Sequence, residues 1–259
     1  MMKIEYPGLG IEYSLHNHSN FSDGANTLEE VCRRGKDIGL KCVGISDHWC
    51  EHPSEGTDWA DWCMAHERLD EYVEQVLALK KRYDDENFTF KLGLEVDYFA
   101  ENFSETRKRL EQYPFDYLIG SVHYTGVFSV DHDIADWVGL SEDESDDICE
   151  IYWNKIAQAA DTGFYTFIGH LDLPKKFGMI KEEKYLSHAL KVLDILQKRG
   201  GAIEINTAGL FKNCKAPYPS YTIISEAQKR NIPLVISADA HHIDHLNRSF
   251  IEVSEMLKK

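Results

Sequence analysis

The sequence is short of positive charge. It contains 28 lysines and arginines against 44 aspartates and glutamates, which gives a formal net charge of −16. The basic residues are scattered and form no stripe of the kind that a groove for nucleic acid requires, so we expect no nucleic-acid partner. Part of the acidity is expected to be local, because a metal site gathers carboxylates that its cations then neutralise.

Long hydrophobic runs are also lacking. No segment approaches the ~20 apolar residues of a membrane-spanning helix, and residues 1–7 contain no apolar signal core. We therefore expect a cytoplasmic protein that has no membrane partner. Its oligomeric state has no signature in the sequence.

Cysteine pairs with metal-binding or redox spacing are missing as well. The six cysteines, at positions 32, 42, 50, 63, 149 and 214, include no C-x-x-C pair. A chain of 259 residues buries a core that needs no disulfide staples. The thiols are therefore expected to be reduced, mostly buried and without a part in catalysis.

What the sequence does contain is an alternation of short apolar runs with segments of helical periodicity. The predicted strands lie at residues 11–15, 41–46, 88–94, 115–122, 165–169, 202–205 and 233–237. Strands separated by helices pair in parallel through right-handed crossovers. Polar residues follow every strand, as they do around the mouth of a barrel. We therefore predict one α/β domain over residues 1–259, folded as a TIM-like (β/α)7 barrel.

The helical segments carry recognisable start signals. Residues Thr27 to Glu30 have the form of a capping box. The acidic run at 141–147 is expected to begin a helix, because carboxylates favour the first helical turn. The predicted helices are near residues 28–38, 64–86, 104–112, 141–159, 184–199, 220–230 and 245–258.

Imidazoles and carboxylates recur at the C-terminal ends of the predicted strands. The first strand leads into His16-Asn17-His18, whose two imidazoles face the same way if the strand continues, because side chains alternate along a strand. The full set is His16, His18, Asp23, His48, Glu95, His123, His170, Asp239 and His241. Nine such side chains at one barrel rim predict a metal centre that holds several ions. Imidazole and carboxylate without thiolate suit zinc, iron or manganese.

Glu95 has a special place in this set. Nine ligands are enough for three metals if one carboxylate bridges two of them, and Glu95 is the only glutamate available. We therefore expect Glu95 to be the bridging ligand.

The motifs around these residues resemble the polymerase and histidinol phosphatase (PHP) family. They are His16-x-His18, Ser22-Asp23-Gly24, Ser46-Asp47-His48, Gly93-Leu94-Glu95, Ser121-Val122-His123, Gly169-His170 and Asp239-Ala240-His241. Within the family the sequence is most similar to histidinol-phosphate phosphatases, through residues 14–18, 44–48 and 168–178.

The resemblance implies a distorted (β/α)7 barrel with three divalent transition metals. The first would take His16, His18, Glu95 and Asp239, the second Glu95, His123 and His170, and the third Asp23, His48 and His241. Some relatives have histidine where this chain has Asp23, which makes the third site richer in oxygen.

The chemistry implied is hydrolysis of a phosphomonoester, L-histidinol phosphate, in histidine biosynthesis. A hydroxide that bridges two metals and is positioned by Glu95 attacks phosphorus, and the cations offset the charge on the phosphate oxygens. No covalent enzyme intermediate is expected. A small phosphate ester is therefore the expected partner of an acidic protein whose metals reverse the local field.

Supporting roles fall to residues near the strand ends. Lys175, Lys176 and Arg248 are candidates to bind the phosphate, although both lysines are equally consistent with a solvated loop. Asp47 is expected to orient His48 from behind. Residues 49–60 are expected to form a loop over the site. Trp49, Trp59 and Trp62 are candidates either to stack on a flat substrate group or to cap the core.

Three alternatives remain at this point. Another phosphoesterase of the same family would act on a different small phosphate or on nucleotide ends. A non-catalytic metal-bearing module would have lost some of the ligands that this chain keeps. An amidohydrolase-type barrel would usually rely on a carboxylated lysine or a further histidine where this chain has Glu95.

Overall fold

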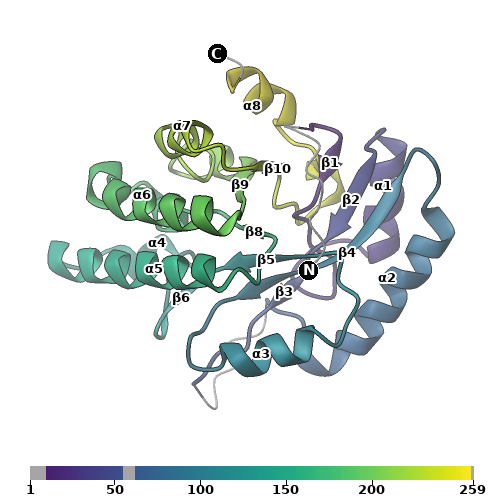
Figure 1. Cartoon of the computed structure of the whole chain (residues 1–259), viewed down its shortest axis with the longest axis horizontal. Helices are drawn as coiled ribbons and strands as arrows, with labels where there is room; N and C mark the ends of the chain where they lie inside the picture. The colour runs from purple at the N-terminus through teal and green to yellow at the C-terminus, as the bar shows by residue number, and fades with distance from the viewer. Residues whose placement is uncertain (1–9, 55–61, 258–259) are drawn as a thin grey trace.

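The protein folds as a parallel barrel, as the sequence predicts. The computed structural model describes residues 10–54 and 62–257. The seven strands of the barrel are β1 (Tyr13–Ser14), β2 (Cys42–Ile45), β4 (Thr89–Asp97), β5 (Tyr117–Ser121), β8 (Phe167–Ile168), β9 (Ile203–Asn206) and β10 (Leu234–Ser237). They pair in parallel in the order β1-β2-β4-β5-β8-β9-β10, and Figure 1 shows helices around the outside of this sheet.

The barrel closes just beyond the ends of its first and last strands. Asn17 and Ala240 form a parallel bridge. The His18 amide donates to the Ala240 carbonyl at 2.9 Å, and the Ala240 amide donates to the His16 carbonyl at 3.1 Å. The closure therefore brings the residues that follow β1 next to those that follow β10.

The helices occupy the predicted connections. They are α1 (Leu28–Asp37), α2 (Leu69–Tyr83), α3 (Phe103–Leu110), α5 (Glu142–Thr162), α6 (Glu182–Arg199), α7 (Tyr221–Lys229) and α8 (Phe250–Met256). The Thr27 capping box is confirmed, since the Thr27 hydroxyl accepts from the Glu30 amide and the Glu30 carboxylate accepts from the Thr27 amide. The acidic run does begin a helix, with Ser141 as its cap.

Three predicted helix boundaries are wrong. The second helix begins at Leu69 rather than near residue 64, because residues His66–Arg68 form a 3-10 turn before it. The second helix ends at Tyr83 rather than residue 86, because the Asp84 and Asp85 carboxylates accept the amides of Phe90 and Phe88 and turn the chain into β4. The last helix begins at Phe250 rather than His245. A 3-10 turn at Ile243–His245 and a left-handed Ser249 precede it.

Several short elements at the mouth of the barrel are not predicted from the sequence. The strand β3 (His48–Trp49) extends the path of β2 and pairs with β4 at Glu95 and Val96. A hairpin of β6 (Tyr124–Thr125) and β7 (Phe128–Ser129) and the short helix α4 (Ile134–Trp137) lie between β5 and α5. Strands of two residues are too short to show a period.

A tyrosine fills part of the barrel interior. The Tyr117 hydroxyl donates to the Leu15 carbonyl at 2.6 Å and lies 3.1 Å from the Ile45 carbonyl. Its ring lies so close to Gly44 and Gly93 that a Cβ at either glycine would come within 2.3 Å of it. These two positions must therefore be glycine for β2 and β4 to pass the ring.

The cysteine side chains are mostly buried, as predicted. All six cysteines have free thiols, and five are buried while Cys214 is partly exposed. Within residues 10–54 and 62–257, no helix has the combination of length and apolarity that crossing a membrane requires.

Candidate metal centre

The nine predicted side chains meet at one end of the barrel. His16 and His18 follow β1, His48 begins β3, Glu95 lies on β4, His123 follows β5, His170 follows β8, and Asp239 and His241 follow β10. Asp23 reaches the group from the loop between β1 and α1. Because parallel strands place their carboxyl ends at the same rim, side chains distant in sequence converge there.

Glu95 lies between two groups of imidazoles. Its Oε2 atom is 3.1 Å from His16 Nε2 and 2.7 Å from His48 Nδ1. Its Oε1 atom is 2.7 Å from His170 Nε2 and 3.6 Å from His123 Nε2. The two oxygens of one buried carboxylate therefore face different histidines, which is the arrangement that a bridging ligand needs.

A second cluster lies around Asp23. Its carboxylate is 3.1 Å from His241 Nε2 and 3.7 Å from His48 Nε2. His18 joins this cluster, because its ring stacks on those of His48 and His241 at 4.1 and 4.3 Å. His18 Nε2 is also 3.1 Å from Asp239 Oδ1. His18 thus lies between the first and third ligand groups that the family resemblance implies.

The donor atoms fit divalent metals. Four sets of three or more donors lie within 4.8 Å of one another, among them His16–His18–Glu95, His48–Glu95–His123 and His18–Asp23–His48–His241. Several of these atoms are buried and have no well-aligned hydrogen bond in the described structure: His16 Nε2, His18 Nδ1, His48 Nδ1, His170 Nδ1 and Glu95 Oε2. Buried polar atoms normally have partners, so these atoms are arranged for cations.

The electrostatics of the cluster follow from burial and mutual contact. Burial lowers the pKa of His16, but Glu204, Glu95 and Asp239 outweigh it and raise that pKa well above the ordinary value. Burial lowers the pKa of His18 to about 3, and the neighbouring His48 and His241 rings act in the same direction. Protons and metals compete for these atoms, so metal binding releases protons.

Two carboxylates behind the ligands are missing from the predicted set. The Asp97 carboxylate lies 2.9 Å from His123 Nδ1 and accepts the His123 amide at 2.9 Å. Burial lowers the pKa of His123, but Asp97 outweighs it and raises that pKa to about 10. Glu204 Oε1 lies 2.6 Å from His16 Nδ1. Two features of the sequence could have predicted these carboxylates. Asp97 lies two residues after Glu95 and so on the same face of the strand, and Glu204 is a single charged residue within an apolar run.

Asp47 is placed differently from the prediction. Its buried carboxylate accepts hydrogen bonds from the amides of Ser19 and Ser22 at 2.8 and 3.1 Å and from their hydroxyls at 2.8 and 2.5 Å. These contacts hold the loop that carries Asp23, instead of orienting the His48 ring.

Replacing Asp47 with alanine is therefore expected to destabilise the protein. Four donors would lose a buried, charged acceptor, which costs about 3 kcal/mol in free energy of unfolding. Denaturant unfolding with a chelator present measures this cost apart from metal binding. Asp47→Asn, which keeps one acceptor oxygen, should lose less. An unchanged free energy of unfolding for Asp47→Ala would show that the loop does not depend on Asp47.

The centre opens into a cleft of about 1270 Å³. Arg248 and Lys176 line this cleft together with Asp23, His48, His123, His170, Asp239 and His241. Lys176 is paired with Asp131 at 3.1 Å, and the Arg248 guanidinium lies 3.9 Å from the centre of the Phe211 ring. Both cations are therefore placed at the wall of the cleft.

Lys175 does not share this position, so its predicted contact with phosphate is wrong. Its buried ammonium donates to the Pro217 carbonyl at 2.7 Å and pairs with Asp172 at 2.8 Å. Of the predicted tryptophans, Trp49 is fully buried in the core and Trp62 lines the cleft, with its ring 4.5 Å from that of His48. Trp59 lies outside the described residues.

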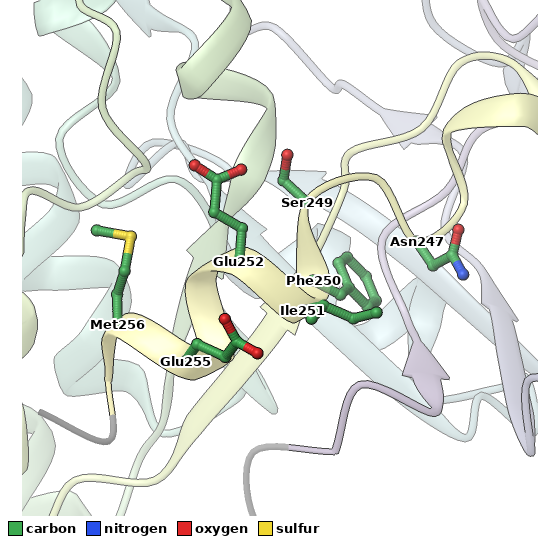
Figure 2. A pocket seen from close by; sticks show the side chains of 7 residues that line it. All are labelled: Asn247, Ser249, Phe250, Ile251, Glu252, Glu255 and Met256. Atoms are coloured by element: carbon green, nitrogen blue, oxygen red, sulfur yellow. The ribbon is translucent and has the colours of Figure 1, made fainter.

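A second hollow, of about 490 Å³, lies along α8 (Figure 2). The residues around it come from α8 and the turn before it, and neither histidine nor cysteine is among those that line it. Its two carboxylates, Glu252 and Glu255, point in different directions. The convergent donors thus belong to the larger cleft.

Comparisons with known proteins point to one family. The model of the PHP domain matches residues 14–208. A probable histidinol-phosphatase of Deinococcus radiodurans is 31% identical over 90% of this chain and 86% of its own length, and the histidinol-phosphatase of Bacillus subtilis is 28% identical over 92% and 97%.

A solved structure is similar in fold. It is the histidinol phosphate phosphatase of Lactococcus lactis subsp. lactis in complex with zinc, L-histidinol and phosphate. Its TM-score is 0.80 at 19% identity, over 95% of this chain and 92% of that chain.

Proposed function

The chain belongs to the PHP domain family, and from this we propose that it is a metal-dependent phosphomonoesterase that hydrolyses L-histidinol phosphate to L-histidinol and phosphate. The observation that carries the proposal is the convergence of imidazoles on Glu95 beside an open cleft. The relatives that bear the name histidinol-phosphatase match this chain over nearly their whole length. We infer that it acts in the cytoplasm, as an enzyme of amino-acid biosynthesis.

The residues of the centre would hold three divalent metals. The proposed sets are His16, His18, Glu95 and Asp239; Glu95, His123 and His170; and Asp23, His48 and His241. When bound, such metals supply a water of lowered pKa and positive charge for the phosphate oxygens. Zinc occurs in the Lactococcus lactis structure, and the same donors also suit iron and manganese.

The cleft offers different surfaces to the two ends of the substrate. Arg248 and Lys176 present cations to the phosphate, which Arg binds through two parallel hydrogen bonds. Trp62 and Phe128 on the cleft wall offer aromatic faces to an imidazole. The size of the cleft suits a small phosphate ester.

A panel of substrates tests this proposal. Release of phosphate from L-histidinol phosphate is expected to have a kcat/KM at least about 100-fold above that for p-nitrophenyl phosphate, glycerol phosphate or a nucleoside monophosphate, because binding of both ends is used in the transition state. Equal values across the panel would contradict the assignment of histidinol phosphate. A preference for nucleotides or short oligonucleotides would favour another phosphoesterase of the family.

Replacing Arg248 with alanine is expected to raise KM for L-histidinol phosphate by roughly 10- to 100-fold, because charge-assisted hydrogen bonds contribute about 1.5–3 kcal/mol. Steady-state kinetics measure the change, and Arg248→Lys should recover part of it. Arg230→Ala is the matched control, since Arg230 pairs with Asp194 and Glu226 outside the cleft lining. A KM equal to that of the wild type would exclude Arg248 from phosphate binding.

A further inference from the structure

One fully buried carboxylate near the centre does not line the cleft. Glu204 lies on β9, and none of its surface is exposed. Removing a carboxylate from water costs free energy unless the surrounding groups donate hydrogen bonds to it or carry opposite charge. The hydrogen-bond donors around Glu204 therefore indicate the role of this buried carboxylate.

Each oxygen of Glu204 has its own pair of partners. Oε1 accepts the Ser237 hydroxyl and lies 2.6 Å from His16 Nδ1. Oε2 accepts the His170 amide at 2.7 Å and the Asn206 side-chain amide at 3.2 Å. Glu204 thus ties together the ends of β1, β8, β9 and β10.

The ligand side chains that its links reach belong to one metal in particular, because its contact with His170 is only to the backbone amide. His16 is in direct contact, and the Asn206 amide that donates to Glu204 also donates to Asp239 Oδ2 at 3.1 Å. Asp23, His48 and His241 have no contact with Glu204 among the described hydrogen bonds and ion pairs. The effect of Glu204 is therefore expected at the His16 end of the centre.

We propose that Glu204 is a positioning residue that holds His16 with its proton on Nδ1, so that the Nε2 lone pair faces the cleft and binds metal. This inference rests on the proposed metal centre. A carboxylate only accepts hydrogen bonds, so the nitrogen that faces it must carry hydrogen. A carboxylate behind a metal-binding histidine also fixes the ring and raises its strength as a ligand.

A glutamine in place of Glu204 would favour the other tautomer of His16, in which Nε2 carries the proton. The His170 amide and the Asn206 NH₂ group can only donate, so they require an oxygen at the place of Oε2. The glutamine NH₂ group would then occupy the place of Oε1 and donate to His16 Nδ1. The proton of His16 would move to Nε2, the atom assigned to the metal. Glu204→Gln therefore keeps the shape of the side chain while it disfavours the ligating tautomer.

Zinc binding tests the inference without reference to turnover. The wild type and Glu204→Gln are compared by elemental analysis after dialysis against a series of zinc buffers. The expected result is a 10- to 100-fold weaker affinity for at least one zinc ion, with the far-ultraviolet circular dichroism of the wild type. Glu204→Asp, which keeps an acceptor-only group, should recover part of the affinity.

Asp172→Asn is the matched control. Asp172 is an equally buried carboxylate that accepts the Ser220 amide and pairs with Lys175, and it contacts none of the nine proposed ligands among the described hydrogen bonds and ion pairs. This variant should lose thermal stability and keep the zinc affinity of the wild type.

Three results would overturn the inference: wild-type zinc affinity in Glu204→Gln, an equal loss of zinc in Asp172→Asn, or a Glu204→Gln chain that no longer folds. The last would show a structural role. The proposed function stands or falls separately, on the hydrolysis of L-histidinol phosphate by the wild type.

Discussion

Replacing Glu95 with alanine is expected to release metal from the protein and to lower the turnover of L-histidinol phosphate by roughly 10³-fold or more. The two oxygens of Glu95 face different groups of imidazoles, with His16 and His48 on one side and His170 and His123 on the other. Its removal would leave these histidines without the carboxylate that joins them.

The charge balance of the centre strengthens this expectation. Burial raises the pKa of Glu95, but His16 and His48 outweigh it and hold that pKa well below the ordinary value. The carboxylate is therefore ionised at neutral pH and is a strong ligand for a cation. An alanine would remove the negative charge that offsets the charge of bound cations, and this loss opposes metal binding.

Elemental analysis and kinetics on the same preparation measure the outcome. Glu101→Ala is the matched control, because Glu101 follows the same strand and is exposed. It should keep both metal and turnover. Full turnover in Glu95→Ala would remove the bridging role from Glu95, and loss of turnover with unchanged metal content would limit its role to the chemical step.

The second large effect is expected from removal of the metals. Dialysis against a chelator should abolish phosphate release and lower the free energy of unfolding. A site that binds only the folded chain contributes about 4 kcal/mol when the free metal is at a thousand times its Kd. This figure already includes the cost that buried carboxylates and imidazoles incur when they lose their cations.

Restoration by metal gives this prediction its control. Zinc, iron or manganese should restore activity, whereas magnesium should restore little, because its preferred ligands are oxygen atoms and most donors here are imidazole nitrogens. The same chelator saturated with zinc should have no effect. Activity that survives exhaustive chelation, as shown by elemental analysis, would contradict a metal-dependent reaction.

The ligand cluster is predictable from the sequence because its members obey a simple rule. Each of His48, Glu95, His123 and His170 lies at the end of an apolar run, and parallel strands bring such ends together. The parallel order of the strands in the barrel then follows from the alternation of strands and helices. Neither inference depends on the details of side-chain packing.

Contacts decided by packing are not predictable in this way. Asp47 and Lys175 lie next to or near ligands in sequence, yet the first bonds to Ser19 and Ser22 and the second to Asp172. Their directions depend on rotamers and on loops from distant segments. The role of Glu204 is not predictable from the sequence either, because its partners follow strands that only the closed barrel brings together.

The central claim is that these imidazoles and carboxylates bind several cations in one cleft. Anomalous diffraction at the zinc absorption edge, on crystals of the zinc-loaded protein, tests it most directly. We predict more than one zinc peak beside Glu95, each about 2.0–2.3 Å from the nitrogen and oxygen atoms of its ligands. Crystals grown in excess zinc that show no peak within reach of Glu95 would contradict the account.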